Sequence, residues 1–192
     1  FMGTTANGQN LSVVITLAGH ESQSIDDLYF EGTLVPLTRE NGTRASENVF
    51  PRSFCFKHLG TADQAADAKL VAIGLWTSAW RQRGRTYIHV LLSNAPGEYP
   101  NGLPNISVVM RGYNGVYDPR TATTGWANNP ALLVAAYLTN QSWGFGADYT
   151  TEIDETALIA AANICDERVS AVYQPNFSRQ GGSPSDGTIV FT

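Results

Sequence analysis

Three histidines, His20, His58 and His89, are the side chains best suited to proton transfer at neutral pH. Nucleophilic catalysis needs a serine or cysteine beside a histidine that a third group orients, and no Gly-X-Ser-X-Gly segment accompanies these histidines. His20 follows Gly19 at an expected strand end, a position suited to function. His89 lies inside the strongest expected strand, which favours a hydrogen-bonded core or sheet-face histidine. The sequence predicts no catalytic triad.

Paired carboxylates are the second source of chemistry, because two converging acids can cleave glycosidic bonds. The obvious candidates among adjacent acids are Asp26–Asp27 and Asp166–Glu167. Neighbours on a strand point to opposite faces and neighbours on a helix point about 100° apart, so neither pair forms a site alone. Acids at a helix C-terminus oppose the helix dipole. The position of Asp166 therefore suggests a partner such as an arginine on another segment.

Metal and cofactor motifs are missing from the sequence. It has no Asp-X-Asp-X-Asp-Gly calcium loop, and Gly144-Phe-Gly146 lacks the third glycine and preceding strand of a phosphate-binding loop. Cys55 and Cys165 are far apart and do not form a pair at metal-ligand spacing. Two buried thiols are the favoured interpretation, with a single Cys55–Cys165 bridge as the alternative. We expect no catalytic residue, no metal and no cofactor.

Tryptophans and arginines offer two further binding surfaces. Four tryptophans could line a sugar-binding surface, although such residues more often anchor core or interface packing. The densest basic stretch is 81–85, with three arginines, and an ordinary solvated turn is the favoured interpretation. The tryptophans are Trp76, Trp80, Trp126 and Trp143.

Composition predicts a folded protein with a sizeable core. The chain has 192 residues, is 43% hydrophobic and 15% charged, and carries a net charge of −5. That charge argues against nucleic acid as a general partner, since phosphate binding needs clustered Lys and Arg. No apolar segment approaches the roughly 18 residues of a membrane span, and the start lacks the pattern of a signal peptide.

Hydrophobic patterning predicts a β-rich first part, 1–113. We expect a loose end over 1–10, a strand over 11–17 and a hairpin over 25–37 that turns at Glu31-Gly32. The segment 38–48 should be an exposed loop, and a helix should begin at Thr61. Further strands are expected at 50–59, 85–92 and 106–111, separated by an irregular segment over 93–104.

The second part, 114–192, is expected to be helical with a terminal strand. Asn129 followed by Pro130 is a helix start, and Thr151 and Asp154 compete as the start of a second helix. Gly144 and Gly146 form the joint between these two short helices. Strands are expected at 171–173 and 188–191. The fold class is thus α+β, β-rich and mostly antiparallel, with two short helices in the C-terminal third.

Several stretches, in this order, resemble one known family. They cover roughly residues 11 to 170, and none of them is catalytic. They are Lys57–Ala66, Trp76–Trp80, Arg83–Tyr87, Tyr99–Asn105, Val116–Arg120, Asn129–Leu132, Gly144–Asp148 and Ile153–Glu167. Together they are similar to the tip attachment (host-specificity) protein J family, the central tail hub of long non-contractile-tailed phages.

The resemblance implies a structural virion protein at the tail tip, assembled in the host cytoplasm. Such hubs are tube-like, β-rich homotrimers that close the distal tail tube in or near the baseplate. They link the tube to the parts that attach to the host. The implied partners are the distal tail tube ring protein, other tail-tip proteins and the tape-measure protein. Family members are far longer than this chain, and after Val169 the sequence departs from the family pattern.

The expected interface residues are few. Tyr117, Asp118, Pro119 and Arg120 should form a rigid charged joint, in which Pro119 fixes φ and Arg120 bridges carboxylates across segments. An ordinary turn is the alternative, and Trp76 and Trp80 are the other candidates. A carbohydrate-active tail enzyme would need two converging carboxylates, and a monomeric receptor-binding module would expose both tryptophans. The small-residue face of the second helix should pack within its own chain.

Overall fold

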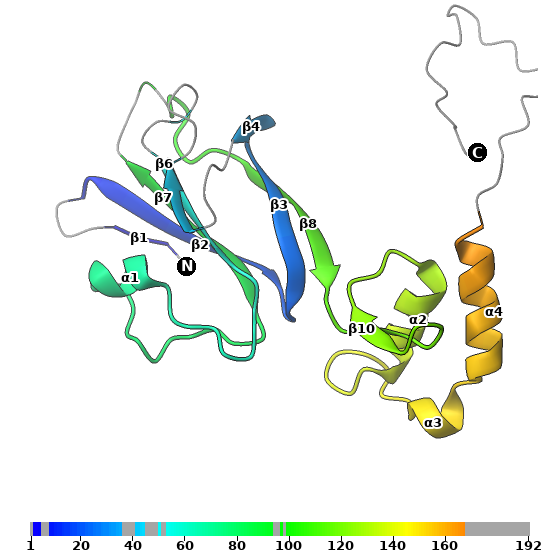
Figure 1. The fold of residues 1–192 in the computed structure, drawn as a ribbon. Helices are drawn as coiled ribbons and strands as arrows, with labels where there is room; N and C mark the ends of the chain where they lie inside the picture. Colours follow the sequence, from blue (N-terminus) through cyan, green and yellow to red (C-terminus); the bar gives the residue numbers. More distant parts are fainter. Residues whose placement is uncertain are drawn as a thin grey trace, which may run out of the picture.

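The computed structural model describes residues 2–4, 8–35, 41–44, 50, 53–93, 97 and 99–167, with backbone alone over 41–44. A β-rich region occupies the first part of the chain, and short helices follow it (Figure 1). The α+β class expected from the sequence is confirmed. The strands expected at 171–173 and 188–191 lie outside the described residues.

Two antiparallel sheets form the β-rich region. The five-stranded sheet has the order β1-β2-β7-β6-β5, and the three-stranded sheet has the order β4-β3-β8. The five strands of the larger sheet are β1 (Met2–Thr4), β2 (Asn10–Ala18), β5 (Asn41–Arg44), β6 (Ser53–His58) and β7 (Thr86–Ser93). The smaller sheet contains β3 (Ser22–Phe30), β4 (Thr33–Val35) and β8 (Ile106–Tyr113).

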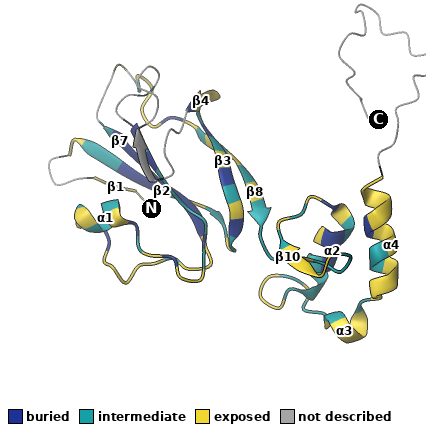
Figure 2. Ribbon diagram, viewed as in Figure 1, coloured by how far each residue is buried: buried dark blue, intermediate teal, exposed yellow. Residues whose placement is uncertain are grey.

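The central strand β7 carries apolar side chains on both faces, as its sequence predicts. Seven of its eight residues are buried (Figure 2). Ile88, Val90 and Leu92 pack with residues of β3, β4 and β6 in the main core. On the opposite face, Tyr87 packs with Leu70 and Trp76 in a second core. Strand β7 therefore contributes to both cores, one on each face of the sheet.

The turn at Glu31-Gly32 is confirmed. Both residues have positive φ, 49° and 74°, which is the geometry of a two-residue hairpin turn whose twist matches that of its strands. Two neighbouring expectations are wrong. The loose end 1–10 contains β1, which pairs with β2, and the loop 38–48 contains β5, which pairs with β6. Edge strands need only backbone hydrogen bonds, so their polar side chains give little strand signal.

The helix expected from Thr61 is displaced. Helix α1 spans Ala68–Ala72 and begins at Asp67, whose side chain accepts the backbone N–H of Leu70. The residues before it are held outside a helix because the side chain of Gln64 accepts from the backbone of Gly60 and donates to the 81–85 loop. Tertiary hydrogen bonds thus override the helical propensity of the alanines.

The second part begins with a hairpin that the sequence pattern did not reveal, β9 (Val116–Asp118) and β10 (Thr123–Gly125). Helix α2 (Pro130–Thr139) starts after Asn129 as predicted. Thr151 lies within a separate single turn, α3 (Tyr149–Glu152), so Asp154 is the start of α4 (Glu155–Cys165). The small-residue face of α4 packs within its own chain only in part: Ala162 is fully buried with Val116 and Leu132, whereas Ala161 and Cys165 are exposed.

The cysteines differ from the favoured interpretation. Both are free thiols, so the alternative Cys55–Cys165 bridge is absent, and Cys165 is exposed at the end of α4. Cys55 is buried in the main core, and burial raises the pKa of its thiol to about 12. A thiol so protonated is a poor nucleophile, and we assign Cys55 a packing role.

Candidate functional site

The expected joint at Tyr117–Arg120 is built around one guanidinium group. Asp118 ends β9, and the turn after it places Arg120 beside the C-terminus of α4. Arg120 donates from Nε and Nη2 to the Asp118 carboxylate at 2.9 and 2.8 Å, and from Nη1 to Asp166 Oδ2 at 2.7 Å. The prediction that Arg120 bridges carboxylates of separate segments is confirmed, as is the arginine partner for Asp166. Its part in an interface stays a prediction.

The electrostatics of this joint leave little room for acid–base chemistry. Hydrogen bonds from Arg120 lower the pKa of both Asp118 and Asp166, and the amide of Asn129 adds to the effect at Asp166. The two carboxylates in turn raise the pKa of Arg120. At neutral pH the group is therefore a fixed ion triad with both acids ionised, whereas a glycosidase needs one of its two acids protonated.

Asn129 connects α2 to the same joint from a buried position. Its Oδ1 accepts the N–H groups of Ala131 and Leu132, while Nδ2 donates to Ala162 O at 2.8 Å and to Asp166 Oδ1 at 2.9 Å. One amide thus caps the start of α2 and binds the last turn of α4. Asn129 therefore joins α2 to the end of α4, and Arg120 joins the hairpin to the same end.

Replacing Asn129 by alanine is expected to destabilise the helical unit by about 1–2 kcal/mol for the lost cap, with a further loss for the two hydrogen bonds that its Nδ2 donates to Ala162 O and Asp166. Asn129→Asp isolates the second role, because it keeps the cap but removes both donors and faces Asp166 with a like charge. We expect Asp to rescue little of the stability measured by urea denaturation. Full rescue by Asp would show that the cap alone matters.

The tryptophans have separate neighbours. Trp76 is 7% exposed in the second core, and Trp80, half exposed, has its ring centroid 5.8 Å from that of Trp76. The guanidinium carbon of Arg111 lies 5.5 Å from the ring centroid of Trp126. The ring centroids of Trp143 and Tyr113 are 5.0 Å apart. The spacing of Trp76 and Trp80 is not helical, since the segment between them is irregular. Only Trp80 of the expected tryptophan pair is open to a partner.

The histidines fall into two environments. His20 contacts the rings of Tyr113 and Trp143, and so links the β-rich region to the loop after α2. His58 Nε2 and His89 Nδ1 both contact the Asp67 carboxylate, at 2.9 and 3.1 Å. The prediction that His89 is a hydrogen-bonded core residue is confirmed. Sequence reasoning missed its carboxylate partner, because Asp67 fell inside the expected helix.

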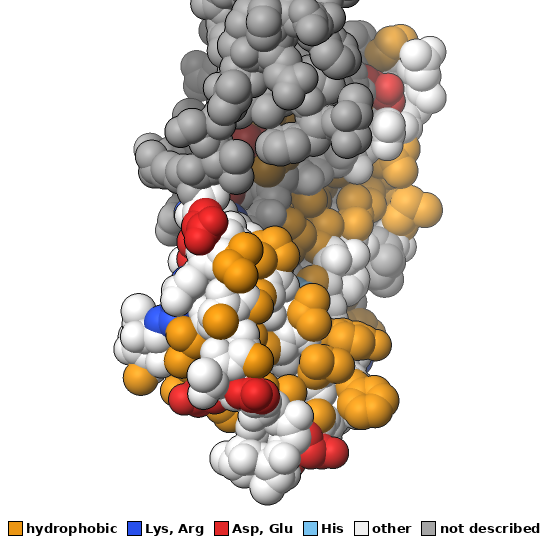
Figure 3. Space-filling view, turned by 90° about the vertical axis from the view of Figure 1, so that its right-hand side faces the viewer, with side chains coloured by type: hydrophobic (Ala, Val, Ile, Leu, Met, Phe, Trp, Pro, Cys, Tyr) orange, Lys and Arg blue, Asp and Glu red, His pale blue; other side chains and the backbone are white. Residues whose placement is uncertain are grey.

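An exposed apolar surface is the main functional feature that the motifs did not indicate. Helix α2 contains no charged residue, and on its outer side Val134 and Tyr137 are 58% and 54% exposed. Hydrophobic side chains spread over this end of the molecule in Figure 3. We call the following set the helical apolar surface. It consists of Leu133, Val134, Tyr137, Trp143, Phe145 and Ile164, each more than 40% exposed.

A hollow of about 250 Å³ lies beside α2 and is lined by residues of β9, α2 and α3, among others. Tyr117 and Tyr149 meet edge to face beside it, with ring centroids 5.4 Å apart, and α2 contributes Ala135 and Ala136 to its lining.

Among the described residues, no group of three or more His, Cys, Asp or Glu is arranged to hold a metal. No helix in that part of the chain is long and apolar enough to cross a membrane.

Comparisons with known proteins find likeness to solved structures and no family. No family model matches the chain, and a search of curated proteins finds no match. A chain from the virion of a native gene transfer agent particle matches with a TM-score of 0.45 and 15% identity. The match covers 83% of this chain and 33% of the other, so this chain spans about a third of that one. These findings assign the chain to no family.

Proposed function

We propose that this chain is a non-enzymatic structural protein of a phage-type virion, part of the tail hub that closes the distal tail tube. It would assemble as a homotrimer, bind the tube ring protein and link the tube to host-recognition parts. Two kinds of support carry the proposal. The ordered sequence stretches resemble a tail hub family, and the helical apolar surface needs a protein partner.

The helical apolar surface is the observation that carries the assembly role. A surface helix normally has one apolar stripe and an opposite polar face. Helix α2 instead buries Leu132 and Ala135 and still exposes Leu133, Val134 and Tyr137. Contiguous exposed apolar residues typically mark protein interaction sites. A helix that is apolar on all sides is expected in the interior of a larger assembly.

The rival enzyme function receives no comparable support. It requires two carboxylates that converge with different protonation states. Asp118 and Asp166, which Arg120 brings together, are both held ionised by hydrogen bonds from its guanidinium group. A rigid ion triad that fixes a hairpin to two helices suits a structural joint better than a catalytic cleft.

Val134→Glu tests the assembly proposal, because it places a charge in the middle of the helical apolar surface. We expect the wild-type protein to have the mass of a trimer by light scattering and to be present in purified particles. The variant should fold normally by circular dichroism and associate at least a hundredfold more weakly, since an unpaired charge buried in an interface is strongly destabilising.

Thr156→Glu is the matched control, since it adds the same charge at an exposed position in the acidic first turn of α4. The control variant should assemble like the wild type. A wild-type chain that is monomeric and absent from particles would contradict the assembly proposal. Equal assembly of Val134→Glu and wild type would exclude the helical apolar surface as the interface.

A further inference from the structure

The loop 81–85 concentrates positive charge in a protein that is acidic overall. Arg81, Arg83 and Arg85 are all exposed, while the chain as a whole carries a net charge of −5. Within the described part of the chain, none of the three guanidinium groups forms an ion pair, and Arg85 donates to the side chain of Gln82 at 3.1 Å. Unpaired like charges so close together are stabilised by an anionic partner.

The backbone of this loop is fixed from beneath by a buried glutamine. Gln64 is 7% exposed, and its Nε2 donates to the carbonyl oxygens of Arg81 and Gln82 at 3.0 and 2.8 Å. Gly84 N donates to Gly60 O at 3.0 Å, and Gln82 holds a φ of 50°, which is uncommon for a residue other than glycine. The loop is therefore ordered before any partner binds, which lowers the entropy cost of binding.

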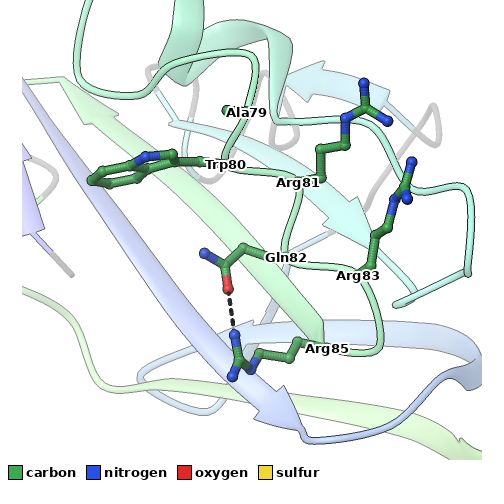
Figure 4. A pocket seen from close by; sticks show the side chains of 6 residues that line it. All are labelled: Ala79, Trp80, Arg81, Gln82, Arg83 and Arg85. Atoms are coloured by element: carbon green, nitrogen blue, oxygen red, sulfur yellow. Dashed lines mark hydrogen bonds between the residues drawn. The ribbon is translucent and has the colours of Figure 1, made fainter.

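An aromatic side chain completes the surface. Trp80 is 50% exposed, and its ring lies against that of the buried Trp76 at an interplanar angle of 56°. In Figure 4 the side chains of Arg81 and Arg83 extend side by side, whereas Trp80, Gln82 and Arg85 point to the opposite side of the loop, with Gln82 between the other two. The loop borders an open hollow of about 790 Å³.

This combination matches the anchors of protein interfaces. Arginine and tryptophan are enriched among the residues that contribute most binding energy, and the guanidinium group binds carboxylates through two parallel hydrogen bonds. A nucleic acid would need a basic surface along many phosphates, whereas this chain has 17 acidic and 12 basic residues. The charge balance therefore favours a protein partner over a nucleic acid.

We propose that the arginine loop, Trp80 to Arg85, is a docking site for an acidic surface of another protein. Arg81 and Arg83 bind a pair of carboxylates, and Trp80, on the side of the loop where Arg85 lies, packs on an apolar side chain of the same partner. The site is separate from the helical apolar surface, so it adds a second contact to the proposed function and stands if the trimer proposal fails.

Fluorescence anisotropy with a labelled oligoglutamate peptide tests the arginine loop on the full chain, at low and at physiological ionic strength. Arg81→Gln and Arg83→Gln should each weaken binding by roughly three- to fivefold, the effect of losing one exposed ion pair. Trp80→Ala should weaken binding of a peptide that carries a leucine beside its glutamates. Arg111→Gln removes the same charge from an exposed arginine of β8 that is paired with Asp26 of β3, and should leave binding unchanged.

Three outcomes would overturn this proposal. Equal weakening by Arg111→Gln would show that the peptide responds only to net charge. Tighter binding of an oligothymidylate of equal length, lost in the Arg81 and Arg83 variants, would identify a nucleic-acid site instead. Loss of self-association in these variants, without any peptide binding, would assign the loop to contacts between copies of this chain.

Discussion

Asp67→Ala is expected to destabilise the protein by about 3–5 kcal/mol, because it removes the buried carboxylate that accepts from three hydrogen-bond donors. The carboxylate is 1% exposed and accepts from His58, from His89 and from the N–H of Leu70. Removing it leaves buried histidine nitrogens and the start of α1 without an acceptor. Urea denaturation at neutral pH measures the loss. Asp63→Ala is the matched control, because Asp63 is an exposed carboxylate of the same segment.

The effect of Asp67 should depend on pH. Burial by itself raises the pKa of this carboxyl group, but the hydrogen bonds from His58, His89 and the Leu70 N–H outweigh burial and place it well below its ordinary value of 3.8. A pKa lowered by folding stabilises the protein above the unfolded value and loses that contribution as the pH falls towards the folded value. The stability gap between wild type and Asp67→Ala should therefore narrow below about pH 4. A gap that stays constant down to pH 2 would contradict the hydrogen-bonded network around the ionised Asp67 carboxylate.

The elements that the sequence predicted well are those whose signals are local. The hairpin turn at Glu31-Gly32, the apolar strand over 85–92 and the cap at Asn129 each depend on neighbouring residues, and all three are present. The link between Arg120 and Asp166 was predictable for a different reason. An acidic residue at a helix C-terminus is unfavourable unless a cation lies nearby, so the position of Asp166 indicated a basic partner.

The elements that were missed depend on contacts between distant segments. Asp67 starts α1 because it also binds His89, which lies 22 residues further along the chain. Strand β5 forms because β6 offers an open edge, and nothing in its own polar sequence indicates it. Cys165 was expected to be buried as part of an apolar stripe, but α2 covers only the Ala162 side of α4.

The functional surfaces were harder to predict than the fold. An apolar residue in a helix is normally assigned to the core, so the pattern alone does not separate Leu132, which is buried, from Val134, which is exposed. The arginine loop was visible as a charge cluster. Its rigidity was hidden, because that depends on the side chain of Gln64.

Gly60→Ala is expected to be strongly destabilising. Gly60 has a φ of +83°, and a Cβ there would lie 2.9 Å from the backbone carbon of Arg85 and 3.1 Å from the carbonyl oxygen of His20. The left-handed backbone costs an alanine about 1–2 kcal/mol, and overlap with two backbone segments adds about 1–3 kcal/mol. The total should be about 2–5 kcal/mol by urea denaturation.

Gly74→Ala separates the two contributions of this cost. Gly74 has a nearly equal φ of +75°, but a Cβ there meets no atom within 4 Å, so only the left-handed backbone is penalised. Gly60→Ala should also weaken the arginine loop, since the Gly60 carbonyl accepts from Gly84 and its N–H donates to the glutamine that holds the loop. Equal losses of stability in the two variants would mean that the chain at Gly60 moves away from Arg85 without cost. In that case the loop is held by Gln64 alone, and Gln64→Ala should then release it.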